Sequence, residues 1–240
     1  MSEYTQIGEV NTWWDEHGAG EPLVLLHPGG ADSRAFDCNI DGLAASFHVY
    51  RLDRRGAGRT ADVDGPIGYE QMALDTIGFI DTVIGEPVHL LGHSDGAPVA
   101  LLVAHLRPDL VRRLVFSAGV FHHEGWLPGV IDLPADVHQW LGDWYGEVSP
   151  DGRAHWDAVQ AKLDRMHREE PTLTPADLAT VATPTLLMFA DDDEVRVEHI
   201  FAMFGALPDA QLAIVPGTGH GLLADKPELC NTMIAEFLTA

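Results

Sequence analysis

The stretch Gly92-His93-Ser94-Asp95-Gly96 decides how this chain is expected to fold. It follows the apolar run 87–91, which predicts a buried strand, and it precedes residues 97–104, which predict a helix. A serine between two glycines, at the turn from a strand into a helix, is typical of a nucleophile elbow. The turn is so tight that a side chain at Gly92 or Gly96 would collide with neighbouring backbone. Ser94 is therefore the predicted nucleophile.

Two more groups with catalytic chemistry follow predicted strands nearer the C-terminus. Residues 184–190 predict a buried strand that runs into the acidic stretch Asp191-Asp192-Asp193-Glu194, and residues 211–215 predict a last strand before a glycine-rich loop with His220. A serine nucleophile needs a histidine as base and an acid to orient it, and after such an elbow the acid precedes the histidine. Because parallel strands end at one edge of a sheet, these groups are expected to meet Ser94 there.

In order and spacing, these motifs resemble those of the α/β-hydrolase superfamily, and the resemblance covers nearly the whole chain. Two earlier segments match as well, residues 25–30 (LLHPGG) and residues 53–60 (DRRGAGRT). The resemblance implies an α/β-hydrolase fold, with a mostly parallel, doubly wound sheet and an inserted helical cap. It implies a core domain of residues 1–119 and 183–240, and a cap of residues 120–182.

The acid has to be chosen from three consecutive aspartates. Many members of the superfamily show Gly-x-x-Asp after this strand, and Ala190 stands at the glycine position, which points to Asp193 as the triad acid. Asp191 is the alternative, and is otherwise expected to accept hydrogen bonds from its loop. Asp192 and Glu194 are expected to be solvated.

The resemblance also implies an oxyanion hole made of backbone N–H groups. One is the amide of the residue after the nucleophile, here Asp95. The superfamily usually has His-Gly where this chain has His27-Pro28, and proline has no N–H, so the second donor is expected from Gly29, with Gly30 as the alternative. Arg54 is expected to brace this loop, the alternative being that it binds an anionic group at the entrance.

The implied cap has helical patterning and contains Trp126, Trp140, Trp144 and Trp156. A lid over the nucleophile would exclude water and shape an apolar pocket. Trp126, Trp140 and Trp144 are the candidates for substrate binding. The alternative for each of them is that it packs the cap onto the sheet.

Three further helices are expected from local patterns. Residues 35–46 and 69–84 predict two of them. Asp225 is expected to cap the C-terminal helix, because Glu228 follows three residues later as in a capping box.

Composition sets limits on function. The chain has 240 residues, enough for one α/β domain, with 14 Lys and Arg against 37 Asp and Glu, so its formal net charge is −23. This charge argues against nucleic-acid and membrane-surface partners. Cys38 and Cys230 form neither a disulfide framework nor a zinc site, and no metal-binding motif is present. The chain shows no signal peptide or spanning apolar run, so a cytoplasmic location is expected.

The resemblance implies a serine hydrolase without cofactor or metal that cleaves a small-molecule carboxylic ester or lactone through an acyl-enzyme. A serine at the elbow argues against dehalogenases and epoxide hydrolases, which use aspartate there. The alternatives are an α-amino-acid ester hydrolase, a carbon–carbon bond hydrolase, a cofactor-free haloperoxidase or perhydrolase, and a ligand-binding scaffold without turnover. A homodimer is compatible with the sequence.

Asp95 bears on one of these alternatives. Ser-Asp-Gly at the elbow is similar to the valacyclovir-hydrolase branch, in which that aspartate binds the substrate's amino group. Otherwise the Asp95 carboxylate hydrogen-bonds within its own loop at a helix N-terminus, where negative charge is stabilised. We favour this bracing role.

Overall fold

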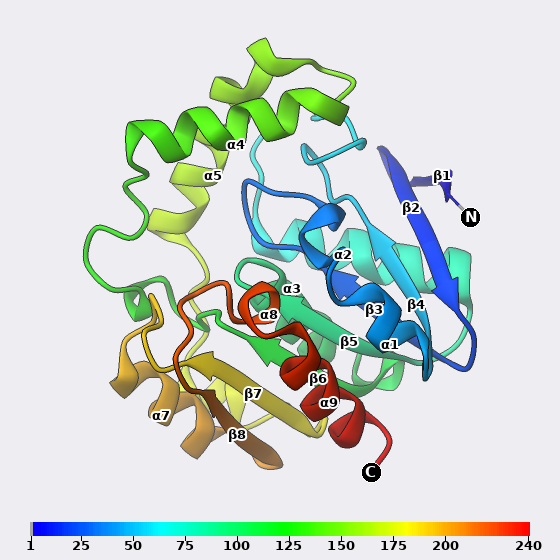
Figure 1. The fold of residues 1–240 in the computed structure, drawn as a ribbon, viewed down its shortest axis with the longest axis vertical. Coiled ribbons are helices and arrows are strands. Elements are labelled where there is room, and N and C mark those ends of the chain that lie inside the picture. The colour runs from blue at the N-terminus through cyan, green and yellow to red at the C-terminus, as the bar shows by residue number, and fades with distance from the viewer. Residues whose placement is uncertain (1) are drawn as a thin grey trace.

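The computed structural model describes residues 2–240, which form one eight-stranded sheet flanked by helices (Figure 1). In space the strands follow the order β1-β2-β4-β3-β5-β6-β7-β8. β2 runs antiparallel to β1 and β4, and all other neighbouring strands are parallel, which confirms the predicted fold class. The strands are β1 (Ser2–Ile7), β2 (Val10–Gly18), β3 (Glu21–Leu26), β4 (Phe47–Leu52), β5 (Val88–His93), β6 (Val111–Ser117), β7 (Thr185–Ala190) and β8 (Ala210–Val215).

Helices cover both faces of the sheet. In Figure 1, α2 and α3 lie behind the strands, whereas α1, α8 and α9 lie in front of them. Within residues 2–240, no helix is both long enough and apolar enough to cross a bilayer. The α-helices are α1 (Ile40–Ala44), α2 (Tyr69–Phe79), α3 (Gly96–Leu106), α4 (Ala135–Val148), α5 (Trp156–Glu169), α6 (Pro175–Leu178), α7 (Val197–Ala206), α8 (Leu222–Asp225) and α9 (Pro227–Leu238).

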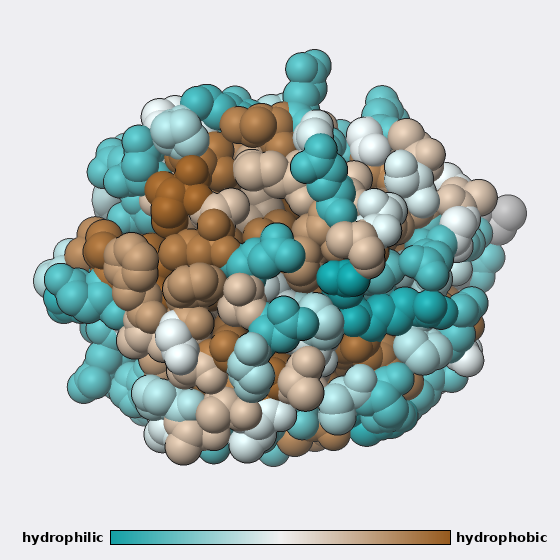
Figure 2. All heavy atoms as spheres, turned by 90° about the horizontal axis from the view of Figure 1, so that it is seen from below, coloured by the Kyte–Doolittle hydropathy of each residue, from teal (hydrophilic) through white to brown (hydrophobic). Residues whose placement is uncertain are grey.

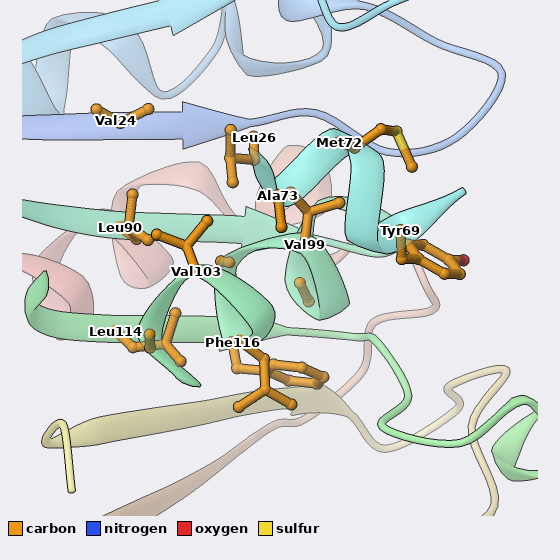
Figure 3. Close-up of a cluster of buried hydrophobic side chains, with 14 of the residues drawn as sticks. Val24, Leu26, Tyr69, Met72, Ala73, Leu90, Val99, Val103, Leu114 and Phe116 are labelled. Carbon is orange, nitrogen blue, oxygen red and sulfur yellow. The ribbon is translucent and has the colours of Figure 1, made fainter. Parts of the chain in front are cut away.

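The central strands are apolar on both sides because each face of the sheet has its own core. In β3, Val24 and Leu26 enter the core shared with α2 and α3, part of which is drawn in Figure 3. Leu23 and Leu25 enter the opposite core, shared with α1 and α9. Each fully buried Leu or Val side chain contributes about 2 kcal/mol. The unbroken apolar runs of the sequence follow from this double burial.

Two local predictions were wrong. A helix was expected over residues 35–46, but the α-helix there is shorter, α1 (Ile40–Ala44), and the chain before it forms a 3-10 helix over Ser33–Phe36. Asp225 does not cap the C-terminal helix. It is the last residue of α8, and the N-cap position of α9 is held by Lys226, followed by Pro227.

The segment between β6 and β7 (the insert) is helical. It contains α4, α5 and α6, and Figure 1 shows α4 and α5 at the top of the molecule, outside the two helical layers that flank the sheet. Its connections to the core place it after the carboxyl end of β6. That residues 120–182 form a separate cap domain stays a prediction.

One side of the molecule exposes apolar side chains. Figure 2, viewed from below Figure 1, shows apolar side chains gathered on the left, the side on which α7 lies. The exposed apolar residues of α7 are Val197, Phe201 and Phe204, and Ile214 of the edge strand β8 is exposed as well. An exposed apolar face of this kind is compatible with self-association. That the protein forms a homodimer stays a prediction.

Candidate active site

Ser94 lies at the turn between β5 and α3, in a conformation that ordinary residues avoid. Its φ is 53°, in the left-handed region, which costs a residue other than glycine on the order of 1 kcal/mol or more. The positions two residues before and two residues after Ser94 must be glycine. A Cβ on Gly92 would overlap the Gly96 carbonyl, and a Cβ on Gly96 would overlap the Leu26 carbonyl. The Ser94 amide donates to the Ser117 carbonyl, 2.8 Å away, which ties the turn to β6.

Ser94, His220 and Asp193 form a hydrogen-bonded chain. The Ser94 Oγ lies 2.9 Å from the His220 Nε2, and the His220 Nδ1 lies 3.0 Å from the Asp193 Oδ1. Asp193 follows β7 and His220 follows β8, so both come from loops at the carboxyl ends of strands. The structure thus brings together the three residues that the sequence predicts as nucleophile, acid and base.

Backbone amides hold the Asp193 carboxylate in place. The N–H groups of Ala190 and Glu194 donate to it at 2.9 and 2.8 Å. Burial acts to raise the pKa of Asp193, but the hydrogen bond and the charge of His220, together with the two backbone amides, lower it. Burial acts to lower the pKa of His220, but the bond to Asp193 and the charge of Glu194 raise it. Asp191, the alternative acid, instead accepts from a loop amide at 3.2 Å.

The two amides predicted to form an oxyanion hole are free. Among residues 2–240, the N–H groups of Gly29 and Asp95 make no hydrogen bond, and both residues line the same cavity as the serine. Only glycine fits at position 29, because a Cβ there would overlap the Asp95 carboxylate. The buried Arg54 guanidinium donates to the backbone carbonyls of His27 and Pro28. Arg54 therefore braces this loop.

A cavity of about 190 Å³ lies beside Ser94 and His220. The Trp126 indole stands edge-on to the His220 ring, with the ring centroids 5.9 Å apart. The insert supplies most of the apolar wall, through Trp126, Val130, Ile131, Leu133, Leu141 and Leu163.

Of the three tryptophans predicted to bind substrate, Trp126 is the one that lines the cavity. Trp140 is 58% exposed and packs against Trp144, and the Trp144 indole N–H donates to Asp32 at 2.8 Å. Helix phase explains the difference: Leu141 faces the cavity, and the adjacent Trp140 is rotated from it by about 100° around α4. Within the described residues, Trp140 and Trp144 do not belong to the wall, so their assignment is corrected.

A comparison of the sequence with known protein families agrees with the site assigned from this geometry. A family model described as "Alpha/beta hydrolase family" matches residues 23–232, which include Ser94, Asp193 and His220. The chain belongs to the alpha/beta hydrolase family. It is a hydrolase of that family, and its motifs follow one another in the order that the sequence analysis expected.

Known proteins resemble this hydrolase over nearly its whole length. A protein of Azorhizobium caulinodans named "Putative carbamate hydrolase RutD" is 24% identical and aligns with 98% of this chain and 97% of its own. The crystal structure of the meta-cleavage product hydrolase CumD of Pseudomonas fluorescens IP01 has a TM-score of 0.84 at 20% identity, covering 99% and 97% of the two chains. The enol-lactonase of Burkholderia xenovorans LB400 has a TM-score of 0.81 at 18% identity, covering 99% and 100%. At these identities the solved structures establish a shared fold.

The hydrolase has a second carboxylate–histidine pair beside Ser94, which the sequence analysis missed. The Asp95 carboxylate lies 2.8 Å from the His167 Nε2 and accepts from the Tyr69 hydroxyl at 2.7 Å. Burial acts to raise the pKa of Asp95, but the charges of His167 and Arg54 lower it to about 2. Burial acts to lower the pKa of His167, but Asp95 raises it. The two side chains therefore form a charged pair between about pH 2 and pH 6.5.

A sequence signal for His167 exists, although it is weak. Gln160, Leu163 and His167 of α5 are spaced i, i+3 and i+7, which places them on one helix face, and all three line the cavity of the hydrolase. The chain has 13 histidines, however, and no local motif links His167 to Asp95, 72 positions earlier.

The candidate site contains no evident place for a metal ion. Among residues 2–240 of the hydrolase, no three His, Cys, Asp or Glu side chains are grouped so that they could hold one. Cys38 and Cys230 are free thiols. That the hydrolase needs no metal or other cofactor stays a prediction.

Proposed function

We propose that this hydrolase cleaves a small-molecule carboxylic ester or lactone, with Ser94 as nucleophile. The observation that carries the proposal is the 2.9 Å separation between the Ser94 Oγ and the His220 Nε2, with Asp193 3.0 Å from the other ring nitrogen. A histidine so placed takes the hydroxyl proton as the oxygen attacks a carbonyl carbon. Asp193 orients the ring and stabilises the imidazolium that forms.

The reaction then proceeds through an acyl-enzyme. As Ser94 attacks, the carbonyl oxygen becomes negative, and the free N–H groups of Gly29 and Asp95 are the proposed donors to it. Each such donor typically contributes about 3 kcal/mol of transition-state stabilisation. His220 then protonates the leaving alkoxide, which departs as an alcohol. A water molecule gives a proton to His220 and attacks the acyl carbon, and His220 then returns the proton to the Ser94 oxygen as the acid leaves.

The insert is the proposed cap over Ser94, and its side chains support the proposed reaction. Its apolar side chains, with Trp126 beside His220, cover a cavity of about 190 Å³, which suits a small substrate. A covered, largely apolar site excludes bulk water and so strengthens the electrostatic contributions of the donors. Residues 120–182 are the proposed limits of the cap.

The bonds of Asp95 argue against the amino-acid ester alternative. Both carboxylate oxygens of Asp95 lie within 3.0 Å of the His167 Nε2, and one of them also accepts from Tyr69. A substrate ammonium group would therefore compete with an imidazolium that already balances the carboxylate charge. We propose that Asp95 braces the elbow and ties it to the insert.

Carbamate hydrolysis is a second candidate. The relative named as a carbamate hydrolase aligns with 98% of this chain, and the carbonyl of a carbamate is open to the same attack by Ser94. Carbon–carbon bond hydrolysis and perhydrolysis are supported by relatives of similarly low identity, at 27% and 24%, and by likeness of fold, which does not select a reaction.

A fluorophosphonate probe and a substrate panel test the proposal. The wild-type protein should be labelled at Ser94, and it should hydrolyse members of a panel of p-nitrophenyl esters, lactones, aminoacyl esters and carbamates. Ser94→Ala should lower kcat by roughly 10⁶-fold, with circular dichroism unchanged. A Ser94→Ala protein with near-native activity would exclude Ser94 as nucleophile. Labelling without turnover of any panel member would favour a ligand-binding scaffold.

A further inference from the structure

The apolar cavity beside Ser94 carries three polar groups whose hydrogen bonds are incomplete. Among residues 2–240, the Trp126 Nε1 and the Gln160 Oε1 have no partner, although both side chains are more than nine-tenths buried. His167, which lines the same cavity, bonds Asp95 through Nε2 and makes no hydrogen bond through Nδ1. Buried polar atoms are nearly always paired. The Trp126 and Gln160 atoms have almost no accessible surface of their own, so His167 is the member of the three that can reach a ligand in the cavity.

The amide orientation of Gln160 follows from its neighbour. Its Nε2 lies 2.6 Å from the Asp164 Oδ1, and a carboxylate only accepts hydrogen bonds, so the nitrogen has to face Asp164. The free end of Gln160 is therefore its oxygen, which is an acceptor.

The free nitrogen of His167 is a donor. Asp95 raises the pKa of His167 above its ordinary 6.5, so below that pH the ring carries a proton on Nδ1 as well as on Nε2. The His167 side chain is 17% exposed and lines the cavity, so this N–H has room for an acceptor there.

We propose that His167 binds a second oxygen atom of the substrate, and that the hydrolase therefore selects esters or lactones with an additional uncharged oxygen acceptor, such as a keto oxygen. The inference rests on the proposed function of Ser94 and adds a substrate class to it. Hydrogen bonds from a charged donor are stronger than those between neutral groups, so this contact discriminates between substrates.

The charges around the cavity favour an uncharged acceptor over a carboxylate. Asp95 already balances the charge of His167, since their side chains are 2.8 Å apart. Glu194 adds a negative charge to the same wall. A substrate carboxylate would gain the bond to His167 but would be repelled by Glu194 and by the acidic surface of a chain with net charge −23.

The test compares esters of nearly equal size. Methyl 4-oxopentanoate and methyl 5-oxohexanoate carry an added keto oxygen, methyl pentanoate and methyl hexanoate lack it, and monomethyl succinate carries a carboxylate instead. An alcohol-side pair, 2-oxopropyl acetate against propyl acetate, covers the other orientation. Each kcat/KM is divided by the rate constant for hydroxide hydrolysis, which removes differences in intrinsic reactivity. At least one keto ester should exceed its unsubstituted partner by about tenfold or more.

His167→Gln is the informative variant. The glutamine amide nitrogen can take the position of Nε2 and still donate to Asp95, but it has no counterpart to Nδ1–H. We expect the keto preference of this variant to fall about tenfold, toward parity. His155→Gln is the matched control, because His155 also belongs to the insert and its Nε2 lies 2.8 Å from a core carboxylate, that of Asp62. This control makes the same substitution at a histidine–carboxylate contact that does not line the cavity, and it should keep the keto preference.

Each outcome decides one question. Hydrolysis of all esters without a keto preference would overturn the inference and leave the proposed function intact. An equal loss of preference in both histidine variants would assign the effect to loosening of the insert and would also overturn it. A preference for monomethyl succinate would overturn the uncharged acceptor.

A binding measurement keeps the inference testable if no ester is hydrolysed. In Ser94→Ala with ¹⁵N-labelled histidine, methyl 4-oxopentanoate should shift the His167 Nδ1 resonance, and methyl pentanoate should not. That result without turnover in the wild-type protein would support His167 and contradict the proposed function. Equal shifts with both esters would overturn the role of His167.

Discussion

Two carboxylate–histidine pairs lie close to Ser94, and they use opposite nitrogens of the imidazole ring. Asp193 holds the His220 Nδ1 at 3.0 Å and leaves Nε2 to Ser94. Asp95 holds the His167 Nε2 at 2.8 Å and leaves Nδ1 without a hydrogen bond, in a side chain that lines the cavity. The first pair thus presents a base to the nucleophile, and the second presents a proposed donor to the substrate.

The pairs also differ in what they connect. Asp193 and His220 both follow strands of the core, so the sheet fixes their separation. Asp95 belongs to the elbow, whereas His167 is in the last turn of α5 in the insert, so their bond joins two parts of the molecule. We expect loss of the first pair to affect catalysis most, and loss of the second pair to affect stability and substrate choice.

The largest effect should come from breaking the core pair. Asp193→Asn should lower kcat by about 10⁴-fold, because an amide can donate to the ring nitrogen and so favour the wrong tautomer of His220. Asp191→Asn should change kcat only severalfold, since Asp191 accepts a loop amide and does not touch His220. KM should change little in either variant, and steady-state kinetics with one p-nitrophenyl ester measures both. A larger loss in the Asp191 variant would mean that the acid is misassigned.

The core pair was predictable from sequence because local rules place its members. Apolar runs predict the strands, the elbow glycines predict Ser94, and parallel strands end at the same edge of the sheet. The register after β7 then selects Asp193 from its neighbours. The pair with His167 depends instead on where α5 of the insert comes to lie over the elbow, and no local pattern encodes that packing.

Side-chain direction within the insert was equally beyond the sequence. Aromatic content indicates an apolar wall but not the phase of α4, so Trp140 was assigned to a cavity that Leu141 lines. The capping prediction at Asp225 failed for a similar reason. The short helix α8 ends at Asp225. The Asp225 Oδ2 accepts from the Gly219 amide at 3.4 Å, and this contact depends on the loop that carries His220.

A smaller effect on catalysis, with a clear one on stability, should follow from breaking the second pair. Asp95→Ala leaves the partly buried His167 ring and the Tyr69 hydroxyl without their partner, which should cost about 3 kcal/mol of unfolding free energy. For a chain of this size that lowers Tm by roughly 6–12 °C. Displacement of the elbow should lower kcat/KM about tenfold or more for aminoacyl and simple acyl esters alike.

The same variant tests the ammonium alternative. The backbone N–H of residue 95 remains in Asp95→Ala, so the proposed oxyanion hole is unchanged. Calorimetry and a paired ester assay measure both consequences. A selective rise of KM for aminoacyl esters, with Tm unchanged, would show that Asp95 binds a substrate amino group and does not brace the elbow.

The smallest expected effect is a pH dependence of stability that belongs to the second pair alone. The pKa of folded His167 is raised above its ordinary 6.5, so its contribution to stability is complete below pH 6.5 and is lost as pH rises through the folded pKa. The pKa of folded Asp95 is lowered from 3.8 to about 2, so its contribution is complete above pH 3.8 and is lost as pH falls toward 2. The pair therefore stabilises the fold most between pH 3.8 and pH 6.5.

His167→Gln isolates the alkaline side of that window. The glutamine keeps a bond to Asp95 but carries no titrating proton, so the variant should be less stable than the wild-type protein at pH 5.5 and closer to it at pH 9. The core pair is present in both proteins, so the titration of His220 cancels in the difference between them. Urea unfolding at the two pH values measures it, and each 1 kcal/mol corresponds to roughly 2–4 °C in Tm for a chain of this size. A difference that stays the same at pH 5.5 and pH 9 would mean that His167 is uncharged in the folded protein, and the contrast between the two pairs would then be one of position and not of charge.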